Sequence, residues 1–68
     1  MVTIMECRKK NNISIAEMAF KLGISQQEYE NIEKYKSEIG IEMAVNFALA
    51  TKTKMEEIYF FNPEIQLN

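Results

Sequence analysis

A group of hydrogen-bonding side chains follows Ser25 and consists of Gln26, Gln27, Glu28 and, one helical turn further on, Asn31. A side-chain amide donates and accepts hydrogen bonds at once, so adjacent glutamines can match a partner surface that presents both donors and acceptors. Two glutamines taken alone, however, are ordinarily solvated surface residues. Whether this group does more than face water depends on the elements that position it.

Two capping boxes define those elements. Ser14 precedes Glu17, and Ser25 precedes Glu28, each with the S-x-x-E spacing in which the two side chains hydrogen-bond to each other's backbone amides. Gly23 stands between the boxes and can adopt the positive φ that ends a helix and turns the chain. The spacing predicts a helix of about eight residues, a short turn and a second helix of similar length. This is the pattern of a helix-turn-helix.

A wider set of residues surrounds this motif. Its members are Arg8, Glu17, Ala19, Leu22, Gly23, Ser25, Gln26, Gln27, Ile32, Glu33, Glu56, Glu57, Ile58 and Tyr59. With this set the sequence resembles, over roughly residues 4 to 60, the Cro and repressor family of phage and bacterial helix-turn-helix regulators. The resemblance implies an all-α, compact, five-helix, lambda-repressor-like DNA-binding domain with the helix-turn-helix at its second and third helices.

The spacing of apolar residues predicts where the other helices lie. They are expected over residues 3–10, 26–34, 41–51 and 54–60, in addition to the helix that Ser14 begins. In the segment 41–51 apolar residues occur on nearly every side, which is typical of a buried central helix. In the segment 54–60 we expect Met55, Ile58 and Tyr59 to face the core.

Length and the composition of the last residues predict one domain with a short tail. A chain of 68 residues is one small domain at most; we place it at residues 1–62, followed by a C-terminal tail at 63–68. The apolar residues near this end are Phe60, Phe61, Ile65 and Leu67. They either form the contact with a second copy of the chain or fold back onto the core, and the sequence favours neither.

Composition excludes several classes of function. Apolar residues make up 47% of the chain and charged residues 26%, which argues against disorder. With one cysteine and no histidine, an intrachain disulfide, a Cys/His zinc site and histidine-based nucleophilic catalysis are all excluded. No apolar run approaches the length of a membrane span. We therefore expect no enzyme, no metal, no cofactor and no membrane partner, and a reducing cytoplasm as the compartment.

The resemblance also assigns roles to individual residues. In the family the third helix enters the major groove of DNA, and its first residues touch base edges. Glutamine suits this task because its amide can bond to both N6 and N7 of adenine. Gln26 and Gln27 are therefore the expected base readers, followed by Glu28 and Asn31. Phosphate contacts are expected from Ser14 at the start of the preceding helix and from Lys34, Lys36 and Ser37 in the loop that follows.

Two further positions follow from the resemblance. Arg8 and Glu33 match family positions that pair across the first and third helices, so we expect an ion pair that is at least partly buried; the alternative is two solvated charges. Tyr35 departs from the family, which usually has glycine there. The resemblance therefore does not predict the usual turn at this residue.

Charge leaves two hypotheses open. The net charge is −2, and Glu28 and Glu30 would repel a phosphate backbone, whereas Lys34 and Lys36 would attract it. The first hypothesis is a sequence-specific transcriptional regulator that binds double-stranded DNA as a homodimer on a two-fold operator. The second is a protein-binding module of the same fold, an antirepressor or modulator that occupies a partner regulator. A positive potential over residues 26–36 favours the first, and a negative potential the second.

Overall fold

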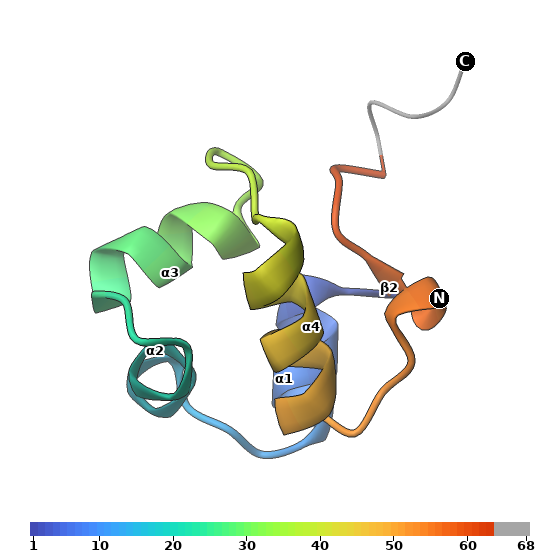
Figure 1. Cartoon of the computed structure of the whole chain (residues 1–68), viewed down its shortest axis with the longest axis horizontal. Coiled ribbons are helices and arrows are strands. Elements are labelled where there is room, and N and C mark those ends of the chain that lie inside the picture. Colours follow the sequence, from blue (N-terminus) through green and yellow to red (C-terminus); the bar gives the residue numbers. More distant parts are fainter. Residues whose placement is uncertain (64–68) are drawn as a thin grey trace.

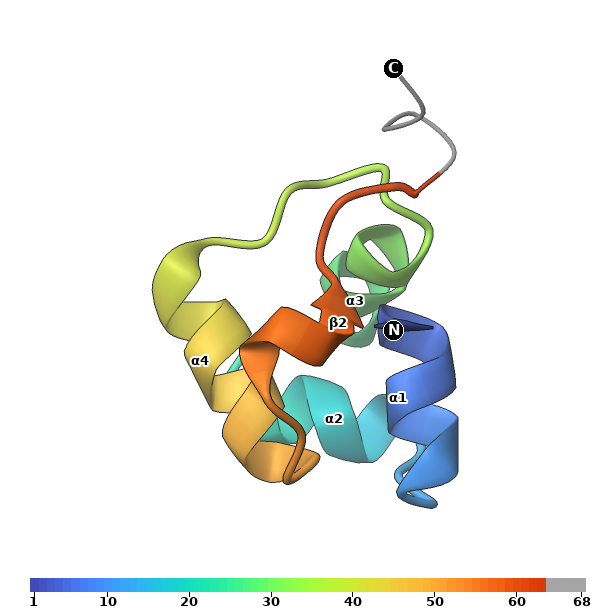
Figure 2. The ribbon, with the colours of Figure 1, turned by 90° about the vertical axis from the view of Figure 1, so that its right-hand side faces the viewer.

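The computed structural model describes residues 1–63. Within them the elements are β1 (Val2–Thr3), α1 (Ile4–Lys10), α2 (Ile15–Leu22), α3 (Gln26–Glu33), α4 (Ile41–Ala50), a 3₁₀ turn η1 (Met55–Glu57) and β2 (Ile58–Tyr59) (Figure 1). The helices α1 and α4 overlap in Figure 1 but lie on opposite sides of the molecule in Figure 2, with α2 crossing between them. No helix of residues 1–63 has the length and apolar character needed to cross a bilayer.

The helix-turn-helix begins each of its helices with a capping box, as the S-x-x-E spacing predicts. At α2, Ser14 Oγ accepts from the Glu17 amide at 3.0 Å, and the Ser14 amide donates to Glu17 Oε1 at 3.1 Å. At α3 the equivalent distances between Ser25 and Glu28 are 3.1 and 2.9 Å. These bonds satisfy amides that the first turn of a helix otherwise leaves without a partner.

Gly23 makes the turn between the two helices. Its φ is +74°, the left-handed conformation that glycine adopts without steric cost. The Gly23 amide donates to the carbonyl of Phe20 at 3.1 Å, and the Ile24 amide donates to that of Ala19 at 3.0 Å. The last carbonyls of α2 are thereby satisfied, and the chain is redirected into α3.

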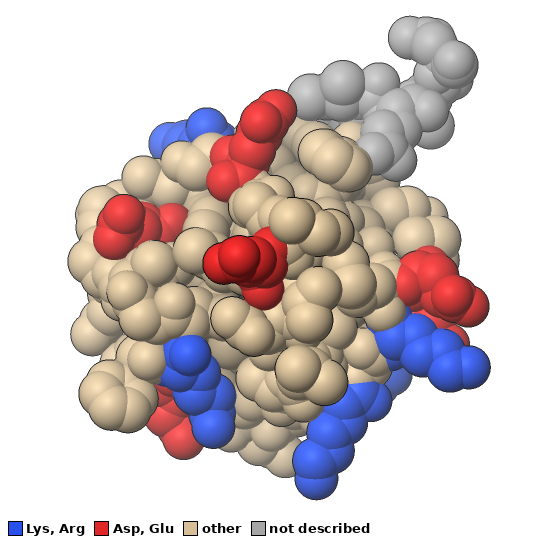
Figure 3. Space-filling model, in the orientation of Figure 1, with Lys and Arg blue, Asp and Glu red and all other residues tan. Residues whose placement is uncertain are grey.

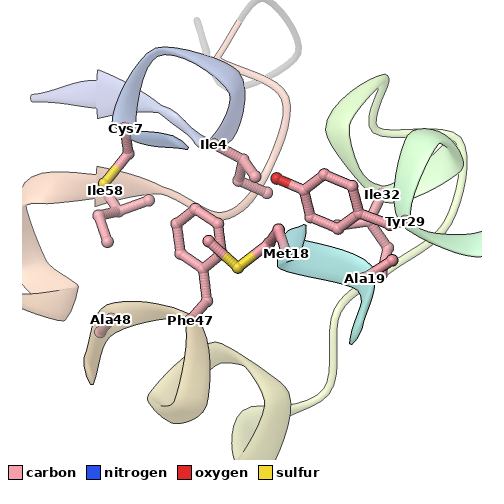
Figure 4. Packing of buried hydrophobic residues seen from close by; sticks show 9 residues of the cluster. All are labelled: Ile4, Cys7, Met18, Ala19, Tyr29, Ile32, Phe47, Ala48 and Ile58. Carbon is pink, nitrogen blue, oxygen red and sulfur yellow. The ribbon is translucent and has the colours of Figure 1, made fainter. Parts of the chain in front are cut away.

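One apolar core joins all the helices. Its buried members are Ile4, Cys7, Met18, Ala19, Tyr29, Ile32, Phe47, Ala48 and Ile58 (Figure 4). Ala19 is small where α2 packs against its neighbours, and Cys7 is only 1% exposed, as expected of a cysteine acting as a small hydrophobe. The core holds the inner faces of α2 and α3 and leaves their outer faces to solvent.

The prediction that α4 is buried on nearly every side is wrong. Its inner face consists of Ala44, Phe47 and Ala48, whereas Ile41 is 70% and Leu49 71% exposed. The helix lies at the surface of the bundle and has only one face available for the core. Its second apolar face is turned to solvent.

The predicted fifth helix over residues 54–60 is also wrong, and the described residues contain four α-helices rather than five. After η1 the chain becomes extended, and β2 pairs in parallel with β1, Val2 opposite Ile58 and Thr3 opposite Tyr59. The run of β-branched and aromatic residues from Ile58 favours an extended chain. At the N-terminal end of the chain, Thr3 belongs to β1 and also caps α1, through a third capping box that it forms with Glu6.

The described part of the C-terminal apolar segment lies partly on the core. The rings of Phe47 and Phe60 meet edge to face, with centroids 6.1 Å apart, and Phe61 is exposed. Ile65 and Leu67, which we expected to belong to the same apolar tail, lie outside the described residues.

Candidate functional site

The outer face of α3 carries the exposed amides. Gln26, Gln27 and Glu28 are exposed, and Asn31 is half-buried one turn further on. The Nε2 of Gln27 donates to Oδ1 of Asn31 at 3.3 Å. The two side chains therefore lie side by side on one surface, as the i, i+4 spacing on a helix requires.

Glu28 stands on the same turn but is already engaged. Its Oε1 accepts from the Ser25 amide at 2.9 Å, so the carboxylate is held against the start of α3. A carboxylate near the positive end of a helix is favourable for the helix. Among the residues expected to contact bases, Glu28 therefore also stabilises the start of α3.

The loop after α3 is fixed against the end of that helix. The helix ends at Glu33 rather than Lys34, which serves as its C-cap. The carbonyl of Asn31 accepts from the amides of Lys36 at 2.8 Å and Ser37 at 3.3 Å. Lys34, Lys36 and Ser37 are all exposed. The loop is therefore a defined turn that presents two basic side chains and a hydroxyl beside α3.

Tyr35 holds this turn to the rest of the molecule, a role that the sequence did not reveal. It has the left-handed φ of +59° that the family's glycine would supply. Its hydroxyl accepts from the Ile4 amide at 3.2 Å and donates to the Tyr59 carbonyl at 2.6 Å. A left-handed residue with a β-carbon costs roughly 1–2 kcal/mol, which these two hydrogen bonds offset. The signal in the sequence that could have indicated this role is a large residue with a hydroxyl group at a position where the family usually has glycine.

A buried ion pair fixes α3 from behind. Arg8 and Glu33 are each only 7% exposed, and Arg8 Nε donates to Glu33 Oε2. Arg8 also donates through Nη2 to Glu33 Oε1 at 3.4 Å and through Nη1 to the Ile13 carbonyl at 2.9 Å. Tyr29 adds a bond from its hydroxyl to Glu33 Oε2 at 2.7 Å. Within residues 1–63 no buried side-chain nitrogen or oxygen lacks a partner.

The environment of this network raises the pKa of two of its members, Arg8 and Tyr29. The hydrogen bond to Glu33 raises the pKa of the Arg8 guanidinium. Burial, and then the hydrogen bond to Glu33, raise the pKa of Tyr29 far above its ordinary value. At neutral pH Arg8 is charged and Tyr29 is a neutral donor, so both bonds to the carboxylate persist.

Ser14 lies at a separate place, the start of α2. It is exposed, and its Oγ accepts from the Glu17 amide, which leaves its hydroxyl hydrogen free to be donated outward. The N-terminal end of a helix attracts anions through its partial positive charge. Lys9 and Lys10, both exposed, end α1 shortly before this point.

The charge of the α3 surface is balanced rather than positive. Over residues 26–36, Lys34 and Lys36 are matched by Glu28 and Glu30, while Glu33 is paired with Arg8. The formal sum is near zero. Hydrogen-bonding amides, not net charge, are thus the distinctive feature of this face.

Comparisons with known proteins agree with this arrangement. A family model described as helix-turn-helix matches residues 4–58, which is most of the chain and includes every helix described above. No curated protein and no solved structure gives a significant match.

Proposed function

The chain belongs to the helix-turn-helix family of the Cro and repressor type, a family of DNA-binding regulators, and from this premise we propose that it is a sequence-specific transcriptional regulator that reads DNA with α3. The observation that carries the proposal is the outer face of α3. The exposed Gln27 and the half-buried Asn31 form a hydrogen-bonded pair there, while the inner face of the same helix is fixed by Glu33.

The amides of α3 are suited to reading base edges in the major groove. In the proposed complex Gln26 and Gln27 contact bases, and the amide of Gln27 bonds to N6 and N7 of adenine. Asn31 is well placed to orient Gln27, because it accepts one of the two Nε2 hydrogens and leaves the other, together with Oε1, for the base. Glu28 contributes to base selection only through its free carboxylate oxygen.

Phosphate contacts fix the position of α3 on the duplex. We assign them to Ser14, at the start of α2, and to Lys34, Lys36 and Ser37 in the fixed turn after α3. Two lysines per copy neutralise few phosphates. For a dimer the logarithm of the binding constant should fall with the logarithm of salt concentration with a slope of about −4.

The proposal includes a homodimer on a two-fold operator in the cytoplasm. Two recognition helices that enter successive major grooves on one side of B-DNA lie about 34 Å apart, so the half-sites would be spaced by one helical turn. Residues 1–62 would form the DNA-binding domain. The chain's concentration would then control occupancy through dimerisation.

The proposal is tested by selection from a pool of random duplex DNA at low and near-physiological salt, with sequencing of the bound fraction. Enrichment of a motif with two-fold symmetry and one-turn spacing supports a sequence-specific dimeric regulator. Absence of enrichment at either salt, from protein that circular dichroism shows to be folded, would reject base reading by α3.

One observation favours a second candidate function. The balanced charge of the α3 surface gives DNA little non-specific attraction, whereas it would not oppose docking on another protein. The same fold would then act as an antirepressor or modulator that occupies a partner regulator. This candidate predicts that the protein lowers the operator affinity of such a regulator while showing no DNA affinity itself, which a competition binding assay measures.

A further inference from the structure

An apolar stripe runs along the outward face of α4, beside the exposed polar residues Glu42 and Asn46. Ile41, Val45 and Leu49 are spaced four residues apart, so they form one stripe, and they are 70%, 39% and 71% exposed. None of the three belongs to the buried core cluster. Contiguous exposed apolar residues on a small protein mark a surface that another molecule covers.

A hollow lies beside the C-terminal half of this stripe. It has a volume of about 490 Å³ and is lined by Val45, Ala48 and Leu49 on the helix and by residues 52–55 in the loop that follows. The lining is mostly apolar, so the hollow can take up an aliphatic side chain. The same face of α4 therefore presents protruding apolar side chains and, next to them, a hollow that can bind an apolar side chain of another molecule.

Charges of opposite sign stand at the two ends of the stripe. Glu42 is exposed in the first turn of α4, and Lys52 and Lys54 are exposed just beyond its last turn. Figure 3, which looks onto α4, shows an uncharged area around this helix, with acidic side chains at the centre and toward the top of the view, further acidic side chains near its left and right edges, and basic side chains mainly in its lower half. A partner that satisfies the whole face must be apolar in the middle, basic at one end and acidic at the other.

We propose that a second copy of this chain covers this face, with the two α4 helices packed antiparallel about a two-fold axis. In a register that sets Val45 against Leu49 of the partner subunit, Ile41 lies over the partner's hollow at the level of residue 53. The same register brings Glu42 beside Lys52 of the partner subunit. Two-fold symmetry forms each of these contacts twice.

The second copy is favoured because one register meets every requirement of the face. A partner of a single charge sign would match one end of the stripe and oppose the other. An antiparallel copy reverses both ends together, so the face is complementary to itself. The inference rests on the proposed function in that it supplies the contact that the proposed dimer needs, yet it can be measured without DNA.

The test is sedimentation equilibrium of the whole chain, without DNA, over a wide concentration range. The wild-type chain should dimerise reversibly, and Leu49→Glu, which places a charge within the apolar contact, should raise the dimer Kd by about 30-fold or more. Phe20→Glu is the matched control, because Phe20 is an exposed apolar residue of α2 (87% exposed) that belongs neither to the α4 stripe nor to the lining of its hollow. It should leave the dimer Kd unchanged, and circular dichroism should show both variants folded.

Charge reversal tests the register itself. Glu42→Lys and Lys52→Glu should each weaken the dimer, and the two changes in one chain should restore much of the wild-type Kd. A dimer that Leu49→Glu leaves intact would overturn the proposal, as would a wild-type chain that stays monomeric at about 1 mM. It would equally be overturned if only a variant lacking residues 64–68 dimerised, because the chain's own end would then cover the face.

The two proposals fail in distinguishable ways. A monomer that still enriches a DNA motif contradicts the α4 contact and leaves base reading by α3 intact. A dimer that is broken by Leu49→Glu but enriches no DNA supports the α4 contact and rejects base reading.

Discussion

The outer faces of α3 and α4 differ completely in chemistry although neither takes part in the core. Gln26 and Gln27 on α3 present amides to water, while Ile41 and Leu49 on α4 present hydrocarbon. Folding requires neither set. This difference underlies the two proposals: a surface that offers hydrogen-bonding groups for α3, and one that buries apolar area for α4.

The inner faces of the two helices differ in the opposite way. The inner face of α3 contains a charged residue, Glu33, which is satisfied by Arg8 and Tyr29, whereas that of α4 is purely apolar around Phe47. The position of α3 thus depends on specific hydrogen bonds, and that of α4 on packing. Five substitutions, together with one control, can break or sharpen this comparison.

Arg8→Met should have the largest effect. It leaves the buried Glu33 carboxylate without its positive partner, so the free energy of unfolding in a urea titration should fall by about 3–5 kcal/mol. Lys9→Met, at the exposed neighbour of Arg8, should change it by less than about 0.5 kcal/mol. Equal and small effects of the two substitutions would mean that α3 is not anchored by this ion pair.

Tyr29→Phe should have a smaller effect that depends on pH. Loss of the bond to Glu33 should lower the free energy of unfolding by about 1–3 kcal/mol at neutral pH. The pKa of Tyr29 is raised in the folded state, so its contribution is fully present below the ordinary tyrosine pKa near 10 and is lost progressively as pH rises from there toward the much higher folded-state pKa. Unfolding titrations between neutral pH and pH 11 should therefore show wild type and Tyr29→Phe converging at the alkaline end. Parallel curves would contradict the assigned role.

Ser25→Ala should have a moderate effect confined to the start of α3. It removes the acceptor for the Glu28 amide and should lower the free energy of unfolding by about 1 kcal/mol. Hydrogen exchange should speed up at the first amides of α3 and remain unchanged in α4. Uniform acceleration across both helices would show that the capping box has no local role.

Gln27→Ala and Leu49→Ala should have the smallest effects on folding. Both side chains are exposed, so each change should alter the free energy of unfolding by less than about 0.5 kcal/mol in samples dilute enough to be monomeric. A larger loss from either variant would show that the corresponding outer face takes part in the fold after all.

Local signals in the sequence predicted the region from α1 to α3 well. The capping boxes at Ser14 and Ser25 and the glycine at position 23 act within a few residues, so spacing alone places the helices. The family resemblance pointed to Arg8 and Glu33, which the sequence does not otherwise connect. Positions of this kind lie far apart in the chain and come together only through the packing of α1 on α3.

Features created by tertiary structure were missed. The strands β1 and β2 are two residues long and have no periodic signal, so the segment 54–60, which contains β2, was predicted to be a helix. Apolar residues on both sides of α4 indicated burial because the sequence cannot distinguish a core face from a face that another molecule covers. The bridging role of Tyr35 depends on Ile4 and Tyr59, which only the folded chain brings near.

The most direct test of base reading by α3 is the DNA selection repeated with Gln27→Ala. The wild-type chain should enrich a two-fold motif, and the variant should enrich the same motif with preference for one base pair relaxed in each half-site, a loss of about 1–3 kcal/mol of discrimination at that position. An identical motif for both proteins, with every position equally preferred, would contradict the account.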